Sequence, residues 1–338
     1  MRISAVAACA ATTLLVLITA ACGTATSPPE VATGAGALPT PSGVAVGPAA
    51  LAGSTPLGGK CGPLPDVAPT GPLPQPGHMP AGSTMARIYA QHYLRVGVDQ
   101  TTEFFGYRDA DGNLVGFDDD VARQIAKAIF GNPNAIRFVV ITSAQRIPDV
   151  QNGTVDLVAD NMTITCDRLQ KVAFSSDYYN AGQTILVPSN SRVTSIHQLG
   201  GQRVCAAAGT TSINEIGQQR PEPIPVSVQN WTDCLVLLEQ GQIAAISTDN
   251  SVLVGLAAQD PQTTMITKPF TCEPHGLAMS IAPGARDFVR FVNGVLEQMR
   301  TDGEWQRLYN QWVAPHLAPQ GPPPPQYNVA VEQTCPWL

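Results

Sequence analysis

The chain has 338 residues, of which 13% are charged, and its formal net charge is −7. This length is sufficient for two domains with substantial apolar cores. The few charges have an acidic balance, which excludes the basic face that nucleic-acid binding requires. We therefore expect no nucleic-acid partner.

The N-terminus, residues 1–21, has the parts of a secretion signal. Arg2 is followed by an uncharged run to Thr19, and small residues then precede Cys22. A transmembrane helix is the alternative, although the apolar run is short for spanning a bilayer. Ala20-Ala21-Cys22 resembles a bacterial lipobox, which implies lipid attachment at Cys22, while Thr19 departs from the usual aliphatic residue. We expect a lipoprotein on the outer face of the cytoplasmic membrane, with plain secretion as the alternative.

Residues 22–84 are rich in proline and glycine. Residues 23–84 contain no aromatic residue, and their only charges are Glu30, Lys60 and Asp66. Such a segment buries too little apolar surface to offset the entropy lost on ordering. The composition predicts a disordered tether that holds a soluble domain at the membrane surface.

Ordered structure is expected from Met85, in an alternating pattern. Strands are predicted at 94–98, 136–141 and 155–159, and helices at 121–129 and 144–152. Asp118, Asp119 and Asp120 fall in the first turn of a helix, where carboxylates suit the positive end of the dipole better than they suit a metal site. The pattern predicts an α/β lobe with a mainly parallel sheet, lobe 1, over residues 85–184.

A second α/β lobe is expected over residues 185–270. Its predicted strands are 203–207, 225–228 and 243–247. One helix is predicted to open at 209–212, and two more are predicted at 231–240 and 251–259. A strand at 276–281 and helices at 285–301 and 303–313 then complete lobe 1 (residues 271–318), before a Pro-rich tail at 319–338. Two chain crossings between the lobes predict a hinge.

Six cysteines remain once Cys9 leaves with the signal and Cys22 is acylated. An even set in an exported protein indicates up to three disulfides, and the layout of elements favours Cys205–Cys234, Cys166–Cys272 and Cys61–Cys335. No CxxC or His-rich spacing occurs, so we expect no metal and no other cofactor.

Four polar strand ends are expected to meet at one cleft, because ligands of open α/β sheets bind outside the carboxyl ends of strands. These ends are Asp99, the turn at 161–165, the turn at 209–211 and Asp249. Together they are complementary to a free amino acid. Arg168, Thr163 and the helix start at Thr210-Thr211 would hold the α-carboxylate, and Asp249, helped by Asp99, would hold the α-ammonium.

Each of these residues has a structural alternative. Arg168 could form a surface ion pair, Asp249 could cap the helix that follows it, and Gly209 could be a turn glycine.

With these residues in view, the chain resembles the bacterial extracellular solute-binding proteins for polar amino acids, the receptors of ABC importers. The resemblance covers residues 85–315. Within this family, the sequence is most similar to glutamine- and glutamate-binding lipoproteins of actinobacteria. The resemblance rests on VGVD (96–99), GFDDDVARQIAKAI (116–129), RIPDVQNGTVDLV (146–158), NMTITCDR (161–168), AAAGTTS (206–212) and TDN (248–250).

The resemblance implies a two-lobed fold of the type II periplasmic-binding-protein kind, with a hinge and an interlobe cleft. It implies that Arg168, Thr163 and Thr211 hold the α-carboxylate, that Asp249 holds the ammonium, and that Asp99 lines the cleft wall. Ala207 and Thr102 depart from the lysine and the aromatic of glutamine-specific relatives, which leaves Phe104 as the aromatic candidate.

Side-chain recognition is expected from two arginines near the cleft. Arg108 has the alternative of a solvated turn charge, and Arg146 that of an ion pair with Asp149 or Asp156. The predicted ligand is Asp, Glu, Asn or Gln. The full predicted ligand-binding set is Asp99, Phe104, Arg108, Arg146, Asn161, Met162, Thr163, Arg168, Gly209, Thr210, Thr211 and Asp249.

The expected mechanism is closure of two lobes of a monomer about the amino acid, followed by docking on an ABC permease or a membrane sensor. The alternative is an enzyme on the same scaffold, dehydratase- or lytic-transglycosylase-like, for which Glu103 is the one candidate acid. No GxSxG, HExxH or P-loop pattern occurs. A purely structural surface lipoprotein is a third reading.

Overall fold

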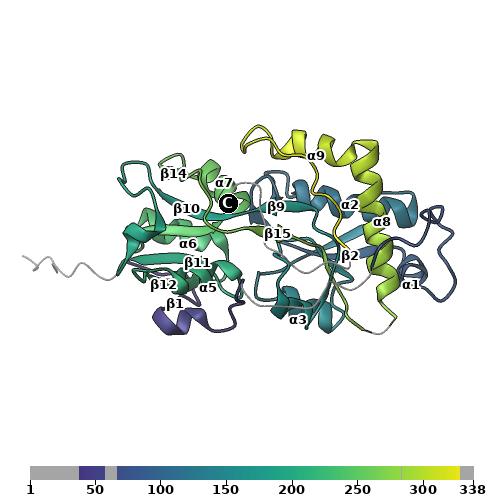
Figure 1. The fold of residues 1–338 in the computed structure, drawn as a ribbon, viewed down its shortest axis with the longest axis horizontal. Coiled ribbons are helices and arrows are strands. Elements are labelled where there is room, and N and C mark those ends of the chain that lie inside the picture. Colours follow the sequence, from purple (N-terminus) through teal and green to yellow (C-terminus); the bar gives the residue numbers. More distant parts are fainter. Residues whose placement is uncertain (1–37, 58–66, 283, 328–338) are drawn as a thin grey trace, which may run out of the picture. The chain divides into compact units, whose positions relative to one another are not determined.

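The computed structural model describes residues 38–57, 67–282 and 284–327, and from Pro39 on these belong to one compact unit (Figure 1). The predicted signal, Cys22, and the predicted Cys61–Cys335 disulfide lie outside the described residues. Among the described helices, none has the length and apolarity needed to cross a bilayer.

A five-stranded sheet in the order β6-β2-β7-β16-β8 forms the centre of lobe 1. β2 pairs in parallel with β6 and β7, and β16 pairs antiparallel with β7 and β8. β2 lies between β6 and β7, and it is mostly apolar and largely buried, with α2 packed against it. The strands are β2 (Leu94–Val98), β6 (Ile136–Val140), β7 (Leu157–Val158), β8 (Ala173–Phe174) and β16 (Ala278–Met279).

The largest apolar core lies between this sheet and its helices. In α2, Val121, Ile125 and Ile129 form the predicted buried stripe, and α8 and α9 pack beside it (Figure 1). The C-terminal helices therefore complete lobe 1. Its helices are α1 (Thr84–Ala90), α2 (Phe117–Phe130), α3 (Arg146–Gln151), α4 (Cys166–Leu169), α8 (Arg286–Asp302) and α9 (Glu304–Trp312), and a small sheet adds β3 (Thr101–Thr102), β4 (Gly106–Arg108) and β5 (Leu114–Val115).

Lobe 2 is built on a six-stranded sheet in the order β1-β12-β11-β13-β10-β14. The predicted disulfide Cys205–Cys234 is present and joins β11 to α6 inside this lobe. Its elements are β1 (Ala45–Val46), η1 (Gly47–Leu51), β10 (Gln183–Pro188), η2 (Ile196–Leu199), β11 (Arg203–Ala207), α5 (Thr211–Gln218), β12 (Ile224–Val228), α6 (Trp231–Glu239), β13 (Ala245–Asp249), α7 (Asn250–Gln259) and β14 (Thr263–Met265).

Two strands carry the chain between the lobes. β9 (Tyr179–Ala181) leads out of lobe 1, β15 (Glu273–His275) leads back, and the two pair antiparallel with Glu273 opposite Ala181. Cys166 and Cys272 are each disulfide-bonded. Their predicted pairing with each other stays a prediction.

Part of the predicted tether is ordered. β1 pairs antiparallel with β12, and Ala50 and Leu51 pack on the core of lobe 2. Farther on, Val67 is buried in the core of lobe 1 and its carbonyl accepts a hydrogen bond from Asn293. The expectation of disorder does not hold for these residues, because their few apolar side chains bury against the lobes rather than against one another.

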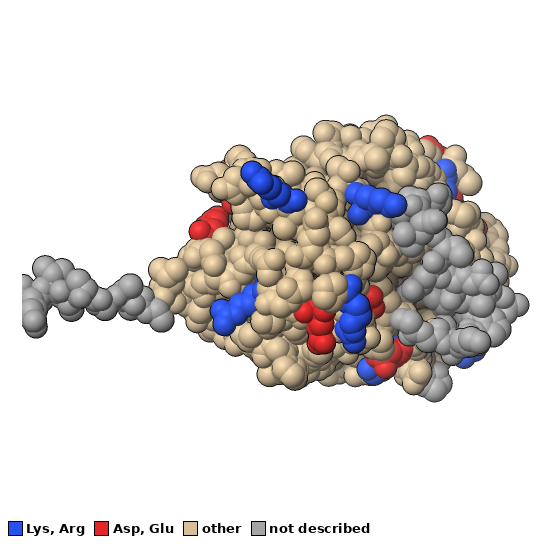
Figure 2. All heavy atoms as spheres, turned by 60° about the vertical axis from the view of Figure 1, so that its left-hand side comes forward, with Lys and Arg blue, Asp and Glu red and all other residues tan. Residues whose placement is uncertain are grey.

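Charged side chains are sparse at the surface. Figure 2 shows one face on which Lys and Arg lie apart from one another, with Asp and Glu between them and mostly uncharged residues around them. The acidic net charge is thus not gathered into a patch on this face.

Candidate ligand-binding site

A cavity of about 10 Å³ lies where polar loops of the two lobes meet. This is room for about one water molecule. Most of its lining is polar, and residues of both lobes contribute. The lining residues are Ser143, Arg146, Asp160, Asn161, Thr163 and Arg168 on lobe 1, and Thr210, Thr211, Ser212, Trp231, Thr248, Asp249 and Val252 on lobe 2.

Arg168 lies at the cavity with its guanidinium buried. Thr165 begins the short helix α4 and accepts the Arg168 backbone N–H at 3.2 Å, which fixes where the side chain starts. Nη1 donates to the Thr163 carbonyl at 2.7 Å and Nη2 to the Gly209 carbonyl of lobe 2 at 3.5 Å, whereas Nε has no partner. Burial lowers the pKa of Arg168 to about 9, so the group stays charged at neutral pH. A buried cation with an open donor suits a carboxylate.

Asp249 supplies the opposite charge, at the end of β13. Its side chain does not cap α7, so that alternative is excluded. Oδ2 lies 2.8 Å from His275 Nε2, and Oδ1 is buried without a partner. Burial raises the pKa of Asp249 to about 7. An open, buried carboxylate oxygen suits an ammonium group.

Glu273 links the two lobes behind the cavity. Its Oε2 accepts hydrogen bonds from Thr163 Oγ1 of lobe 1 at 2.8 Å and from Thr211 Oγ1 of lobe 2 at 2.7 Å. The hydroxyl oxygens of Thr163 and Thr211 lie 3.5 Å apart. Burial, and next to it the charge of Asp249, raises the pKa of Glu273 to about 8. A carboxyl group on the hinge thus touches two cavity-lining residues at once.

The chain is similar to proteins of one known family. The family model described as bacterial extracellular solute-binding proteins, family 3, matches residues 94–315. The chain belongs to this family. The match covers both sheets apart from β1, so the two-lobed fold predicted from the sequence is confirmed.

Several relatives of this solute-binding protein are named for the amino acids that they bind. The ABC transporter glutamine-binding protein GlnH of Bacillus subtilis is 36% identical over 232 residues, 68% of this chain and 84% of its own. A solved receptor for L-cysteine of Neisseria gonorrhoeae has a TM-score of 0.65 and 29% identity, covering 69% and 95% of the two chains. An ancestral arginine-binding protein bound to glutamine has a TM-score of 0.61 and 32% identity, covering 66% and 98%.

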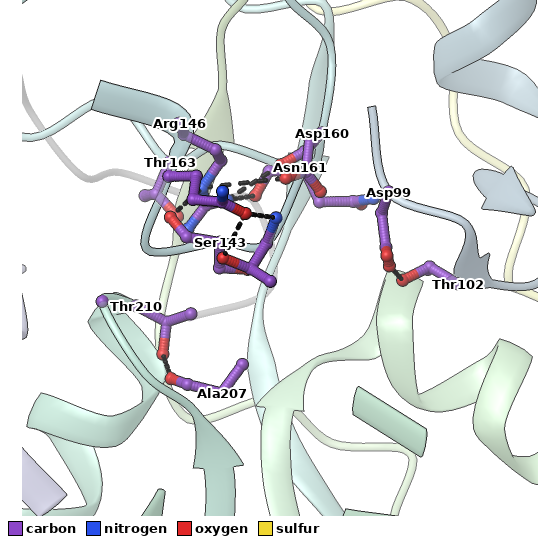
Figure 3. Close-up of polar contacts among 12 residues, drawn as sticks. Asp99, Thr102, Ser143, Arg146, Asp160, Asn161, Thr163, Ala207 and Thr210 are labelled. Carbon is purple, nitrogen blue, oxygen red and sulfur yellow. Dashed lines mark hydrogen bonds and ion pairs between the residues drawn. The ribbon is translucent and has the colours of Figure 1, made fainter. Parts of the chain in front are cut away.

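Arg146 lies at the cavity but not in the ion pair that was the alternative for it. Its Nε lies 3.8 Å from Asp160 Oδ2, and its Nη1 donates to the Asp160 carbonyl at 2.8 Å. Asp156, the residue before β7, instead pairs with Arg87 and Arg95. Figure 3 shows Arg146 grouped with Ser143, Asp160, Asn161 and Thr163.

Asn161 is held at the cavity by the start of α2. Its backbone N–H and its amide both donate to Asp118 Oδ2, at 2.9 and 3.2 Å. Asn161 adopts a φ of 40°, which asparagine tolerates better than most residues. One of the acids predicted at a helix start therefore also positions a site residue.

Several predicted residues lie elsewhere. Asp99 is turned to its own loop, where Thr101 and Thr102 donate to its carboxylate (Figure 3). Phe104 stacks on His316 with ring centroids 3.7 Å apart, and the exposed Arg108 donates to Gln100 and Gly112. None of the three lines the cavity. The strand pattern correctly predicted that Asp99 follows a strand. It could not predict that hydroxyl groups of the same loop would donate hydrogen bonds to the Asp99 carboxylate.

Met162 and Gly209 support the site from outside the lining. Met162 is buried in a small apolar cluster, as expected for the apolar residue between two polar ones. Gly209 has a φ of 76°, and a Cβ there would come within 2.8 Å of Ala144 Cα, so the close approach of the lobe 2 turn to lobe 1 requires glycine. Its contribution is the carbonyl that Arg168 contacts.

Sequence reasoning missed Glu273 and His275. The strand in this region was predicted from residue 276 onward, which left Cys-Glu-Pro-His outside any element. Two ionisable residues beside a hinge crossing were the available signal, because hinge strands pass between the lobes at the base of the cleft. Ser143, Asp160, Ser212, Trp231, Thr248 and Val252 were also missed, since loops and neighbouring helix starts bring them in.

Proposed function

We propose that this protein is a lipid-anchored extracytoplasmic receptor for a small polar amino acid, namely Asp, Glu, Asn or Gln. The observation that carries the proposal is a pair of opposite charges at one cavity. Arg168 Nε and Asp249 Oδ1 are both buried and both without a partner. A zwitterion brings a carboxylate to the first and an ammonium to the second, and so satisfies both groups.

Access to the site requires the lobes to separate, because the cavity has room for about one water. The ligand then stabilises the closed arrangement, since only there is it contacted from both lobes. Gly209 and Thr211 on lobe 2, which face Arg168 and Thr163 on lobe 1, are the contacts that opening would break.

The side-chain end of the site is assigned to Arg146. Asp160 partly neutralises this arginine, which favours a polar amide as well as a second carboxylate. The names of the relatives, which bind glutamine among other amino acids, support the same class of ligand. Replacement of Arg146 by Met is expected to weaken binding of glutamate more than binding of glutamine.

Competitive calorimetry with the twenty amino acids tests the proposal. Tight binding of one or more of Asp, Glu, Asn and Gln is expected. Tight binding of Lys or Arg alone would contradict it, because the cavity then would have to hold a second cation next to Arg146. Absence of binding to all twenty would favour the structural lipoprotein.

Anchoring and delivery belong to the proposal as well. A lipid on Cys22 would keep the receptor beside its membrane partner, an ABC permease or a membrane sensor. Cys22→Ser is expected to release the protein into the medium, and retention of this variant at the membrane would argue for an uncleaved transmembrane segment.

The relatives are transport solute-binding proteins rather than enzymes. An enzyme on this scaffold would need an acid in the cavity beyond those that hold the ligand. Glu103, the candidate for that role, is not among the lining residues. Turnover of a prephenate-like acid or of peptidoglycan by the purified protein would favour the enzyme.

A further inference from the structure

The lobes also contact each other through the C-terminal half of α7, at residues that do not line the cavity. Gln259 Nε2 donates to the Thr101 carbonyl at 3.1 Å, and Gly255 lies against the backbone of Glu103. Thr101 lies in β3 of lobe 1, and Glu103 is in the loop that follows it. Val254 is buried among residues of the lobe 1 core. A helix of lobe 2 therefore packs on lobe 1 at a second place.

Gly255 permits this approach because it has no side chain. A Cβ at this position would lie 2.6 Å from the Glu103 carbonyl oxygen and 2.8 Å from the Glu103 backbone nitrogen. Both are backbone atoms, so no side-chain rotation could make room for it. Gly255 is inside α7 and does not have the left-handed backbone that favours glycine. Since glycine weakens a helix relative to alanine, the contact with lobe 1 is the structural reason for glycine here.

The lobe 1 side of this contact is held by Asp99. Its buried carboxyl group accepts hydrogen bonds from the next two backbone N–H groups and from the hydroxyls of Thr101 and Thr102. Figure 3 shows Asp99 and Thr102 apart from Arg146 at the cavity. These hydrogen bonds fix the backbone of Thr101, so its carbonyl has a defined position when α7 approaches.

α7 connects the contact to the hinge. The Asn250 N–H donates to the Gly182 carbonyl at 3.0 Å, and the Gly182 N–H donates to Asn250 Oδ1 at 3.3 Å, directly after the hinge strand β9. Gln259 ends the helix, and this end lies about 13 Å from Asn250 along the axis. A rotation about the hinge therefore moves Gln259 farther than Asn250. Opening of the lobes breaks the hydrogen bond between Gln259 and Thr101.

We propose that Thr101 and Glu103 of lobe 1 and Gly255 and Gln259 of lobe 2 form a latch that stabilises the closed lobes equally for every ligand, with Gly255 as its positioning residue. The inference rests on the proposed function, because it concerns closure about the amino acid. The fraction of molecules that can close enters the apparent affinity of each ligand as the same factor. The latch thus sets how tightly the receptor binds, and the cavity sets which amino acid it prefers.

The test compares the full chain with Gly255→Ala, by calorimetry with L-aspartate, L-glutamate, L-asparagine and L-glutamine. The affinity for each amino acid that the parent binds is expected to fall by one common factor of roughly 5- to 150-fold, because the methyl group overpacks the closed contact. The melting temperature without ligand should not fall, because alanine is the better helix former. Damage to the fold would lower that temperature, and loss of a ligand contact would change the preference among the amino acids.

Gly217→Ala is the matched control. Gly217 also lies inside a helix of lobe 2, α5, and a Cβ there would come within 3.1 Å of a Leu51 methyl group, which can turn aside. Leu51 packs on the core of lobe 2, so the change leaves the interlobe contact as it is. The affinities of this variant should stay within about twofold of the parent values.

Three results for Gly255→Ala would overturn the inference while leaving the proposed function intact. One is unchanged affinities, and another is a loss that differs strongly between the amino acids. The third is a melting temperature without ligand that falls together with the affinities, since Gly255 would then serve the fold rather than closure. A parent protein that binds none of the four amino acids would overturn both the inference and the proposed function.

A second pair of variants serves if Gly255→Ala does not fold. Gln259→Leu removes the donor to the Thr101 carbonyl, and all affinities are expected to fall by one common factor of about two- to tenfold. Gln306→Leu is the control, because Gln306 donates to Asn310 within α9. Equal affinities in Gln259→Leu and Gln306→Leu would overturn the inference.

Discussion

His275 Nε2 lies 2.8 Å from Asp249 Oδ2, and both side chains are buried. Burial lowers the pKa of His275 to about 4, so at neutral pH this is a hydrogen bond from a neutral imidazole and not an ion pair. When Asp249 is ionised, the imidazole donates its single N–H to Oδ2 and leaves Oδ1 for the cavity. A hinge residue thus orients the carboxylate that is proposed to hold the ligand ammonium.

Replacement of His275 by Phe is expected to weaken amino-acid binding by about 10- to 150-fold, because a hydrogen bond to a charged group contributes about 1.5–3 kcal/mol. The ring volume is kept, so the core should stay packed. Calorimetry at pH 7.5 measures the change. His316→Phe, at an exposed ring that stacks on Phe104, should leave the affinity unchanged. Equal affinities for the two variants would exclude a role of His275 in the site.

Arg168→Ala and Asp249→Asn are each expected to reduce affinity by at least about 30-fold, since loss of one partner of a buried charge pair costs about 2–5 kcal/mol. Arg108→Ala is the control, because Arg108 is exposed and does not line the cavity. A thermal-shift titration with L-glutamine compares the affinities of all three variants with that of the parent protein. If Arg108→Ala loses affinity as strongly as Arg168→Ala, the ligand contacts Arg108 and the cavity is not its site.

Asp156 should carry much of the acid sensitivity of lobe 1. Burial alone would raise the pKa of Asp156, but hydrogen bonds from Arg95 and Gln91 outweigh it and lower that pKa. The stabilisation is present above the unfolded-state pKa of about 3.9 and is lost as pH falls through the lower folded-state value.

Asp156→Asn is therefore expected to lower the free energy of unfolding by about 2 kcal/mol at pH 7, and by less at pH 3. Urea unfolding at the two pH values measures this difference. Asp111→Asn, in an exposed turn, should have little effect at either pH. A loss of stability for Asp156→Asn that is the same at pH 7 and pH 3 would contradict the charge-based explanation.

The Cys205–Cys234 bond closes a loop with a sequence separation of 29 residues. A loop of this size predicts about 3–4 kcal/mol of stabilisation through the unfolded chain. The double variant Cys205→Ala/Cys234→Ala is expected to melt about 6–15 °C below the parent in calorimetry without reductant. A melting temperature within 2 °C of the parent would mean that packing of α6 on β11 already supplies this stability.

The regular elements could be predicted from the sequence because their patterns are long. The strands at 94–98 and 203–207 are confirmed to the residue, and the helix predicted at 285–301 is found at 286–302. Hydrophobic periodicity marks such elements directly. β8 and β9 have two and three residues and lie in a polar run, so no periodicity could reveal them.

The site was predictable where a strand end or helix start fixes a side chain. Arg168, Asp249 and Thr211 were found in this way, and all three line the cavity. Glu273 and His275 were not, because their roles depend on how β15 lies beside the 162–164 turn. That contact joins residues about 110 positions apart in the chain, as the Thr163–Glu273 hydrogen bond shows, and it leaves no local pattern.

The segment before the family-matched region has a practical consequence for handling the protein. Thr55 N–H donates to the carbonyl of Thr210, and β1 covers the edge of β12. A recombinant chain trimmed to residues 94–315 would expose that edge strand. It would also expose the apolar surface of lobe 1 that Val67 covers. Uncovered edges recruit other chains, so such a trimmed product should precipitate or oligomerise where the longer chain stays in solution.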